Sequence, residues 1–79
     1  METNEVFEKV KGLFVEDLGI DESKVTMEAQ LEEDLEIDSL GIVEVVMAFE
    51  DEFEIEIDDE ELADVTTVGQ AVNLLHSKI

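Results

Sequence analysis

Acidic side chains outnumber basic ones so heavily in this chain that charge sets the first limit on its fold. Its 79 residues include 24 Asp and Glu against four Lys and no Arg, which gives a formal charge of −20. Self-repulsion on this scale favours disorder unless the chain buries enough apolar surface. Hydrophobic residues make up 44% of the chain and recur at regular spacings. We therefore expect a folded domain that carries its charge on the surface.

The same charge restricts the partners and the location of the chain. The phosphates of nucleic acids and anionic membrane surfaces would repel it, whereas basic protein surfaces would attract it. Residues 1–5 are acidic and no apolar run follows them, so no secretory signal is predicted. No apolar stretch approaches the roughly 18 residues that a membrane-spanning helix needs. We expect a cytoplasmic, monomeric protein that neither binds nucleic acid nor inserts into a membrane.

Apolar residues recur at helical spacing at both ends of the chain. Near the N-terminus they predict a helix from about Thr3 to Asp17, which Gly19 can end in the left-handed conformation. Near the C-terminus, Thr67 and Gln70 match a capping box that starts the last helix. The only histidine, His76, falls near the last turn of that helix, where it suits the negative helix end.

A second long helix is predicted from Ser39 to about Glu52. Asp38 stands at its N-cap position, where a carboxylate can accept a hydrogen bond from an N–H of the first turn. Leu40 is expected to anchor that turn. The predicted apolar face comprises Leu40, Val43, Val46, Met47 and Phe53, with Ile42, Val45 and Phe49 on its flanks.

Residues 20–38 are predicted to form a long loop with few buried side chains. Leu31 and Leu35 are its expected anchors, joined by Ile20 and Val25. A loop of this length is unusual in so small a domain, and such loops are more often functional than passive connections.

A short helix is predicted between the second and the last long helix. Residues 54–57 alternate as a strand would, but the chain offers no second strand to pair with them. Asp58 and Glu61 match a capping box that opens a helix ending near Val65. The predicted fold is therefore all-α: a small four-helix bundle with three main helices, one short helix and a long loop between the first two main helices, built from residues 1–79 as one domain.

Few residues in this chain could carry out catalysis. Without Cys, Arg or a second His, a catalytic triad cannot be assembled from the usual groups, so we expect no enzymatic activity. A calcium-binding EF-hand loop starting at Asp51 would need an oxygen ligand at its third position and Gly at its sixth. Phe53 and Glu56 stand there, so no specific metal site is predicted. The alternative for the many carboxylates is a solvated acidic face that attracts cations weakly.

Ser39 stands out by its setting rather than by its immediate neighbours. Asp-Ser at the start of a helix is, taken alone, ordinary capping chemistry. Here a long acidic loop delivers the Ser39 hydroxyl to the first turn of an amphipathic helix. The positive end of that helix suits a phosphate ester.

Around this serine the chain resembles a known family. Leu35–Leu40 resembles the Leu-Gly-x-Asp-Ser-Leu attachment motif of acyl carrier proteins. Residues 43–53 look like the second helix of that family, and Asp64–Gly69 is similar to the start of its last helix. Leu18-Gly19-Ile20 fits as well, so the resemblance covers essentially the whole chain at consistent spacing.

The resemblance implies a covalent cofactor and two further sets of residues. A phosphopantetheinyl transferase would attach 4′-phosphopantetheine from coenzyme A to Ser39, with Asp38 and Leu40 beside the attachment site, and the cofactor thiol would carry acyl groups as thioesters. The face read by acyl-processing enzymes with basic patches would comprise Leu40, Val43, Glu44, Met47, Glu50 and Asp51. The acyl pocket would comprise Val45, Val46, Phe49, Leu62, Val65 and Ala71.

The acids at the end of the predicted second helix are also consistent with a partner-binding face. Glu50, Asp51 and Glu52 stand where the helix dipole makes negative charge unfavourable by about 0.3–1 kcal/mol each. A helix selected for stability alone would carry lysines there. These acids therefore suggest that partner binding shaped this face.

Several features depart from the pattern of the family. Gly41 stands where an acid usually follows Asp-Ser-Leu, and Glu36 replaces a common glycine, so partner recognition and the turn before Ser39 are expected to differ. Phe49 and Leu62 are bulkier than the residues often found at their positions. They predict a small cavity and a preference for shorter acyl chains.

The leading interpretation is a carrier of dissociated fatty acid synthesis. Two alternatives remain. One is a specialised carrier of the polyketide type, and the other is an acidic interaction or cation-binding module in which Ser39 is unmodified. Asp38 and the acidity of the chain favour an acyl carrier over a peptidyl carrier.

Because repulsion among the carboxylates costs stability, added salt or divalent cations should raise the melting temperature. Each kcal/mol of relieved repulsion corresponds to about 4–8 °C in a domain of this size. Thermal unfolding followed by circular dichroism across a NaCl and a MgCl₂ series measures this. A melting temperature that does not respond to either salt contradicts the prediction.

Overall fold

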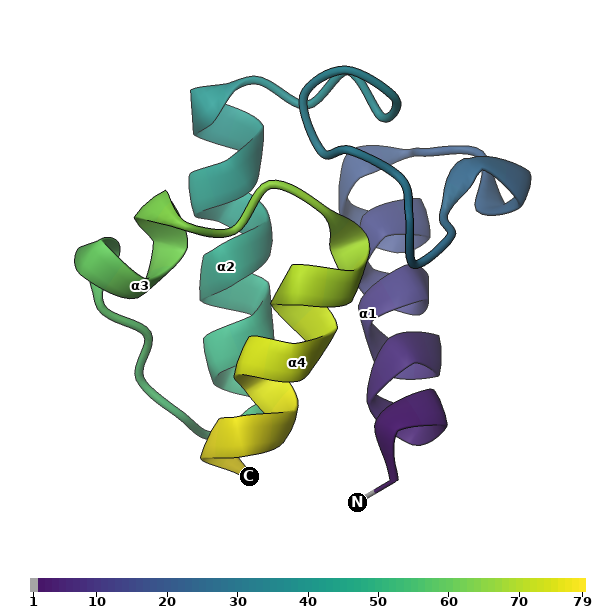
Figure 1. The fold of residues 1–79 in the computed structure, drawn as a ribbon. Coiled ribbons are helices and arrows are strands. Elements are labelled where there is room, and N and C mark those ends of the chain that lie inside the picture. The colour runs from purple at the N-terminus through teal and green to yellow at the C-terminus, as the bar shows by residue number, and fades with distance from the viewer. Residues whose placement is uncertain (1) are drawn as a thin grey trace.

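The computed structural model describes residues 2–79 and contains every predicted helix, together with one short element in the long loop. In chain order the elements are α1 (Thr3–Leu18), the 3₁₀ helix η1 (Glu22–Lys24), α2 (Ser39–Phe53), α3 (Asp59–Ala63) and α4 (Val68–Lys78). Residues 54–57 form no strand. Figure 1 shows α1 and α2 running in opposite directions, with the long loop crossing one end of the bundle and both termini at the other. The all-α four-helix fold predicted from the sequence is confirmed.

The core is organised around α1, which packs against both α2 and α4. Val6, Val10 and Phe14 lie one or two turns apart on α1 and are completely buried. The Phe14 ring meets the Phe49 ring of α2 edge to face, with centroids 5.8 Å apart and an interplanar angle of 89°. This is the favoured arrangement for two aromatic quadrupoles. Leu75 of α4 is also buried within this cluster.

The face of α2 that enters the core differs from the prediction. Val45, Val46 and Phe49 are buried, whereas Leu40, Val43 and Met47 are 74%, 52% and 60% exposed. The prediction that Leu40 anchors the first turn is therefore wrong. Eight of the eleven residues from Ser39 to Phe49 are apolar, so helical spacing alone does not decide which of two apolar stripes faces inward.

Backbone hydrogen bonds fasten the long loop to the start of α4. The N–H of Leu31 donates to the carbonyl of Thr66 at 2.9 Å, and the N–H of Val68 donates to Ala29 at 3.0 Å. The N–H of Gly69 donates to the carbonyl of Met27 at 2.8 Å. A Cβ at Gly69 would lie only 2.8 Å from that same oxygen, so glycine is needed for this close approach.

The buried anchors of the loop are largely those predicted. Val25, Leu31 and Leu35 are buried, as expected, while Ile20 is only half-buried. Ala29 and Ile37 are buried in addition. The loop therefore has a core of its own, which packs against the helices and holds the residues before Ser39 in place.

The capping residues predicted from short sequence patterns are correct with one exception. Gly19 ends α1 with a positive φ of 67°, and Thr67 and Gln70 form the predicted capping box. The capping box predicted at Asp58 and Glu61 is wrong, because the Asp58 side chain accepts no hydrogen bond from an N–H of the first turn of α3 in the described part of the chain. The Glu61 carboxylate instead lies against the ammonium group of Lys78. A charged partner attracts a carboxylate more strongly than a neutral N–H does.

The end of α2 generates a stability prediction. Glu54 adopts the left-handed conformation there, with φ 55° and ψ 51°, and donates its N–H to the Glu50 carbonyl. This region is strained for a residue with a Cβ by about 1–2 kcal/mol. Glu54→Gly should therefore raise the free energy of unfolding by about 0.5–1 kcal/mol after the entropic cost of glycine, as measured by urea denaturation. Glu54→Gln removes only the charge and should give a smaller gain; an equal gain in both variants would contradict the role of strain.

Candidate functional site

Ser39 is the first residue of α2 and is exposed at the end of the bundle crossed by the long loop (Figure 1). Asp38 caps the helix: its Oδ1 accepts a hydrogen bond of 2.8 Å from the N–H of Gly41. This confirms the predicted N-cap. The first N–H groups of any helix have no partner within the helix, and they give this end a partial positive charge.

The residues before Ser39 are held by the loop rather than by the helix. Ile37 is buried, and its N–H donates to the Leu31 carbonyl at 3.0 Å. The N–H of Leu35 donates to Gln30 at 3.1 Å. Ser39 thus projects from a rigid helix end whose approach is fixed by buried side chains and backbone hydrogen bonds.

Glu36 keeps the turn that a glycine would allow. Its φ of 55° lies in the left-handed region, although it carries a side chain. Glu36 adopts the left-handed conformation that favours glycine, and the expectation that the turn before Ser39 differs from that of the family stays a prediction. Its carboxylate side chain is exposed.

Gly41 provides space for Ile37 at the base of the site. A Cβ at Gly41 would lie 2.8 Å from Cγ2 of Ile37 and 3.4 Å from Oδ1 of the capping Asp38. Cγ2 is attached directly to the branched Cβ of Ile37, so it cannot move without the buried side chain moving as well. The sequence indicated only a missing acid at this position, whereas the structure shows a packing role.

Gly41→Ala is therefore expected to destabilise the protein even though alanine favours helices. The added methyl group overpacks the contact with Ile37, which costs about 1–3 kcal/mol and exceeds the gain of about 1 kcal/mol in helix propensity. Urea denaturation of Gly41→Ala, Ile37→Ala and the double variant measures the coupling. In the Ile37→Ala background the Gly41 substitution should be neutral or stabilising. A stabilising effect of Gly41→Ala in the native background would contradict the packing role.

The surroundings of the Ser39 hydroxyl fit a covalently attached phosphodiester. The hydroxyl opens onto a shallow surface hollow lined by Glu32, Glu36, Ile37 and Asp38. Three of these side chains are acidic, and the positive end of α2 offsets their repulsion of a phosphate. The hollow is open to solvent, so an enzyme can reach the serine.

Comparison with known proteins assigns the family. A family model described as the phosphopantetheine attachment site matches residues 8–75. A curated acyl carrier protein of Petrotoga mobilis is 49% identical over 79 residues, covering 100% of this chain and 93% of the relative. The chain belongs to the acyl carrier protein family. The acyl carrier protein of Thermotoga maritima is 48% identical over 75 residues, covering 95% of this chain and 93% of the relative.

A solved structure agrees with this assignment. The crystal structure of an acyl carrier protein from Thermotoga maritima superposes with a TM-score of 0.86 at 32% identity, covering 99% of this chain and 91% of that chain. Membership of the family implies a covalently attached 4′-phosphopantetheine. When bound, this group supplies a thiol that holds acyl groups as thioesters, which the cysteine-free chain itself lacks.

The residues predicted to face partner enzymes lie along one side of α2. Leu40, Val43 and Met47 are exposed apolar side chains, and Glu44 and Asp51 are exposed acids beside them. Their spacings of three, four and seven residues place them on one helix face. This face is therefore both apolar and acidic.

Glu50, the sixth predicted member of this face, is placed differently. It is half-buried, and its Oε2 accepts a hydrogen bond of 2.9 Å from the N–H of Ile57. This contact gives the Glu50 carboxylate a structural role at the end of α2, where the sequence suggested only partner binding.

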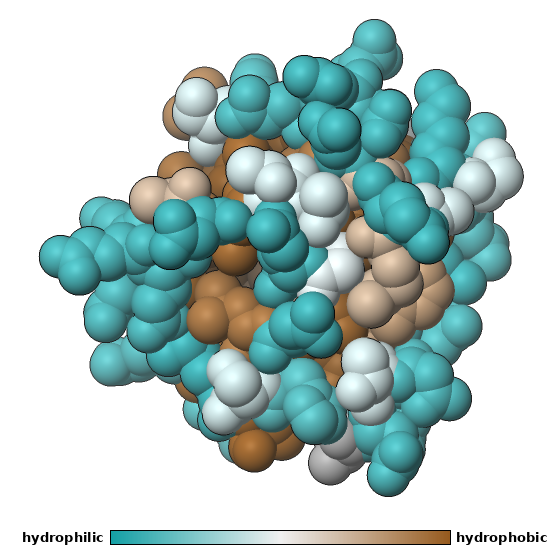
Figure 2. All heavy atoms as spheres, viewed as in Figure 1, coloured by the Kyte–Doolittle hydropathy of each residue, from teal (hydrophilic) through white to brown (hydrophobic). Residues whose placement is uncertain are grey.

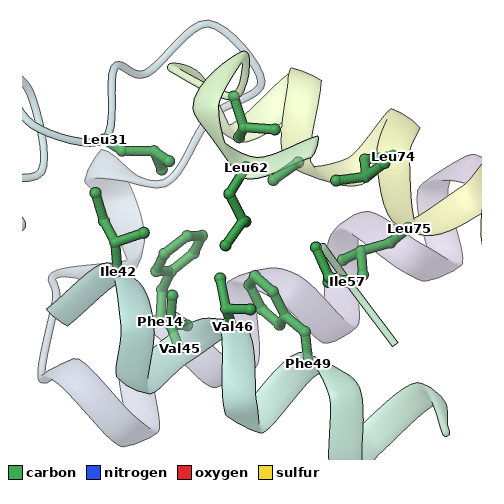
Figure 3. Close-up of a pocket in the computed structure, with 12 residues that line it drawn as sticks. Phe14, Leu31, Ile42, Val45, Val46, Phe49, Ile57, Leu62, Leu74 and Leu75 are labelled. Carbon is green, nitrogen blue, oxygen red and sulfur yellow. The ribbon is translucent and has the colours of Figure 1, made fainter. Parts of the chain in front are cut away.

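The six residues predicted to form an acyl pocket converge on one apolar cavity in the middle of the bundle (Figure 3). Its volume is about 20 Å³, which is room for about one water molecule. Six further residues line it that the sequence did not indicate for this role: Phe14, Leu31, Ile42, Ile57, Leu74 and Leu75. Their apolar periodicity marks them as core residues, but only the packing of the helices shows that they meet there. The preference for shorter acyl chains stays a prediction.

The charge of the chain lies on its surface. Among residues 2–79 no polar or charged side chain is buried, and Figure 2 shows hydrophilic side chains over most of the visible face with hydrophobic atoms between them. No group of three or more His, Asp or Glu side chains in this range could hold a metal ion. No helix in it is long and apolar enough to cross a bilayer.

Proposed function

We propose that this chain carries acyl intermediates of dissociated fatty acid biosynthesis in the cytoplasm, as thioesters on the phosphopantetheine arm of Ser39. It acts as a substrate shuttle and has no catalytic activity of its own. The observation that carries the proposal is the position of Ser39: it is exposed at the head of α2, directly above a helix face that is both apolar and acidic.

That face suits the brief contacts of a carrier. Exposed Leu40, Val43 and Met47 offer apolar area, which contributes affinity once water is excluded. The neighbouring acids attract basic patches on a phosphopantetheinyl transferase and on acyl-processing enzymes. Complementary charge mainly raises the rate of encounter and sets orientation. A monomeric carrier can thus find many partners and leave each one quickly.

Intact-mass spectrometry after coexpression with a phosphopantetheinyl transferase tests the attachment. The native chain should gain one phosphopantetheine, and Ser39→Ala should gain none. Ser23→Ala is the matched control, because Ser23 is also exposed and lies two residues after Asp21, which caps the short helix η1; this variant should be modified like the native chain. A native chain that several transferases leave unmodified would favour the acidic interaction module instead.

Loading of the modified chain tests the pathway. Malonyl transfer and elongation by fatty acid synthesis enzymes should proceed with the modified chain as substrate. Efficient loading by polyketide enzymes, with no turnover by fatty acid enzymes, would assign the chain to the specialised carriers.

Reversal of charge on the partner face should slow transfer. Glu44→Lys and Asp51→Lys should each lower kcat/KM of a phosphopantetheinyl transferase by roughly tenfold at low salt, since steering of the encounter is lost. The difference in kcat/KM between the native chain and these variants should shrink as added salt screens the charges. Glu16→Lys makes the same charge change at an exposed position of α1 and serves as the control. Equal losses in all three variants would show that net charge matters rather than this face.

A further inference from the structure

One wall of the apolar cavity is formed by the segment that connects α2 to α4. We call residues 54–65, which include α3, the cavity cover. The cavity cover contributes Ile57, Leu62 and Val65 to the lining. In Figure 3, Leu62 points into the middle of the cavity, towards the side chains of α2.

The cavity must enlarge before it can hold an acyl chain. Its volume of about 20 Å³ accommodates about one water molecule, whereas even a short acyl chain contains several methylene groups. Some part of the lining therefore has to move outward. The question is which part yields at the lowest cost.

The cavity cover is the part of the lining that packs least tightly. Each long helix contributes at least one lining residue that is at most 2% exposed, namely Phe14, Val45 and Leu75, although Ile42 of α2 and Leu74 of α4 are half-buried. By contrast, Ile57, Leu62 and Val65 are only half-buried. None of the five residues of α3 is buried. Segments with few buried contacts open at lower free energy than the core does, so the cavity cover is expected to move first.

An ion pair joins the middle of the cavity cover to the last turn of α4. The Lys78 ammonium lies 2.8 Å from Oε2 of Glu61 and donates to Oε1 at 3.1 Å. Both side chains are partly shielded, with 25% and 33% of their side-chain surface exposed. The hydrogen bond to Glu61 holds the pKa of Lys78 above its ordinary value of 10.5. The Lys78 ammonium group is therefore charged at neutral pH.

The position of Glu61 in the sequence connects this pair to the cavity. Glu61 immediately precedes Leu62, so fixing the Glu61 side chain on α4 also fixes the residue that points into the cavity. Near the N-terminal end of the cavity cover, the Glu50 carboxylate accepts a hydrogen bond from the N–H of Ile57. Outward movement of α3 with Leu62 can leave the Glu50 contact intact, but it separates Glu61 from Lys78.

We propose that the Glu61–Lys78 ion pair sets the upper length of the acyl chain that the cavity accepts, because it holds Leu62 inside the cavity. The inference rests on the proposed acyl-carrier function. Short chains fit with small adjustments of the lining. Longer chains require α3 to swing outward, and the ion pair opposes that movement.

Thermal unfolding of a series of acylated forms tests the proposal. The native chain, Lys78→Met and Lys9→Met are each loaded with acetyl, butyryl, hexanoyl, octanoyl, decanoyl and palmitoyl groups, and intact mass verifies the loading. Methionine retains most of the apolar stem of lysine while removing its charge. Lys9→Met is the matched control, since Lys9 forms an exposed ion pair with Glu52 at 3.6 Å, away from the cavity lining.

In the native chain and in Lys9→Met the gain in melting temperature should stop rising at octanoyl or a shorter group. In Lys78→Met the gain in melting temperature, measured relative to the unloaded form of the same variant, should keep rising up to a longer acyl group. The exchanged pair Glu61→Lys with Lys78→Glu should restore the native limit. A role in stability alone would lower all melting temperatures equally and leave the limit unchanged, which would overturn the proposal.

The experiment distinguishes a wrong inference about the ion pair from a wrong proposal about the function of the chain. A chain that is never loaded refutes the proposed function. A chain that is loaded, but whose length limit is the same in the native form and in Lys78→Met, refutes only the role of the ion pair. If Lys78→Met unfolds too readily to be measured, Glu61→Gln, which keeps the side-chain shape and removes the charge, gives the same comparison.

Discussion

The edge-to-face contact between Phe14 and Phe49 links the parts of this molecule on which its function depends. Phe14 lies on α1 and is completely buried, and Phe49 lies on α2, the helix that begins at Ser39. Both rings also line the apolar cavity. Since aromatic side chains bury the largest areas in a small core, this one contact orients α2 against α1. It thereby determines which face of α2 is left for partners.

The acidity of the chain becomes compatible with folding because the structure separates its carboxylates from its core. No charged side chain within residues 2–79 is buried, so the desolvation of charge, the largest possible electrostatic penalty, is avoided. Several carboxylates in addition stabilise the fold; among them, Asp38 caps α2, Glu50 accepts a hydrogen bond from Ile57, and Glu61 pairs with Lys78. Repulsion among the remaining exposed carboxylates lowers the stability of the fold, but the same carboxylates make the surface attractive to basic partners.

Sequence patterns predicted local structure far better than contacts between distant segments. Asp38 and the Thr67–Gln70 box were predictable because a cap involves residues three apart. The inward face of α2 was not, since both of its stripes are apolar and the choice depends on α1. Likewise, Glu61 fitted a capping box by spacing, but its real partner lies 17 residues further along the chain. Ser39 could be found because the segments that resemble the family follow one another along the chain at consistent spacing, whereas half of the cavity lining can be recognised only from the packing of the helices.

Two residues beside Ser39, Glu36 and Gly41, depart from the family pattern, and both act on the buried side chain of Ile37. Glu36 costs stability, whereas Gly41 preserves it. Glu36 holds a left-handed turn, at a cost of about 1–2 kcal/mol for a residue with a Cβ. That turn leads directly into Ile37, whose burial contributes about 1.5–3 kcal/mol. Gly41 leaves the space that Ile37 occupies. The gain from burying Ile37 is thus of the same size as the strain at Glu36 or larger, and the buried Ile37 fixes the approach of the chain to Ser39 at the start of α2.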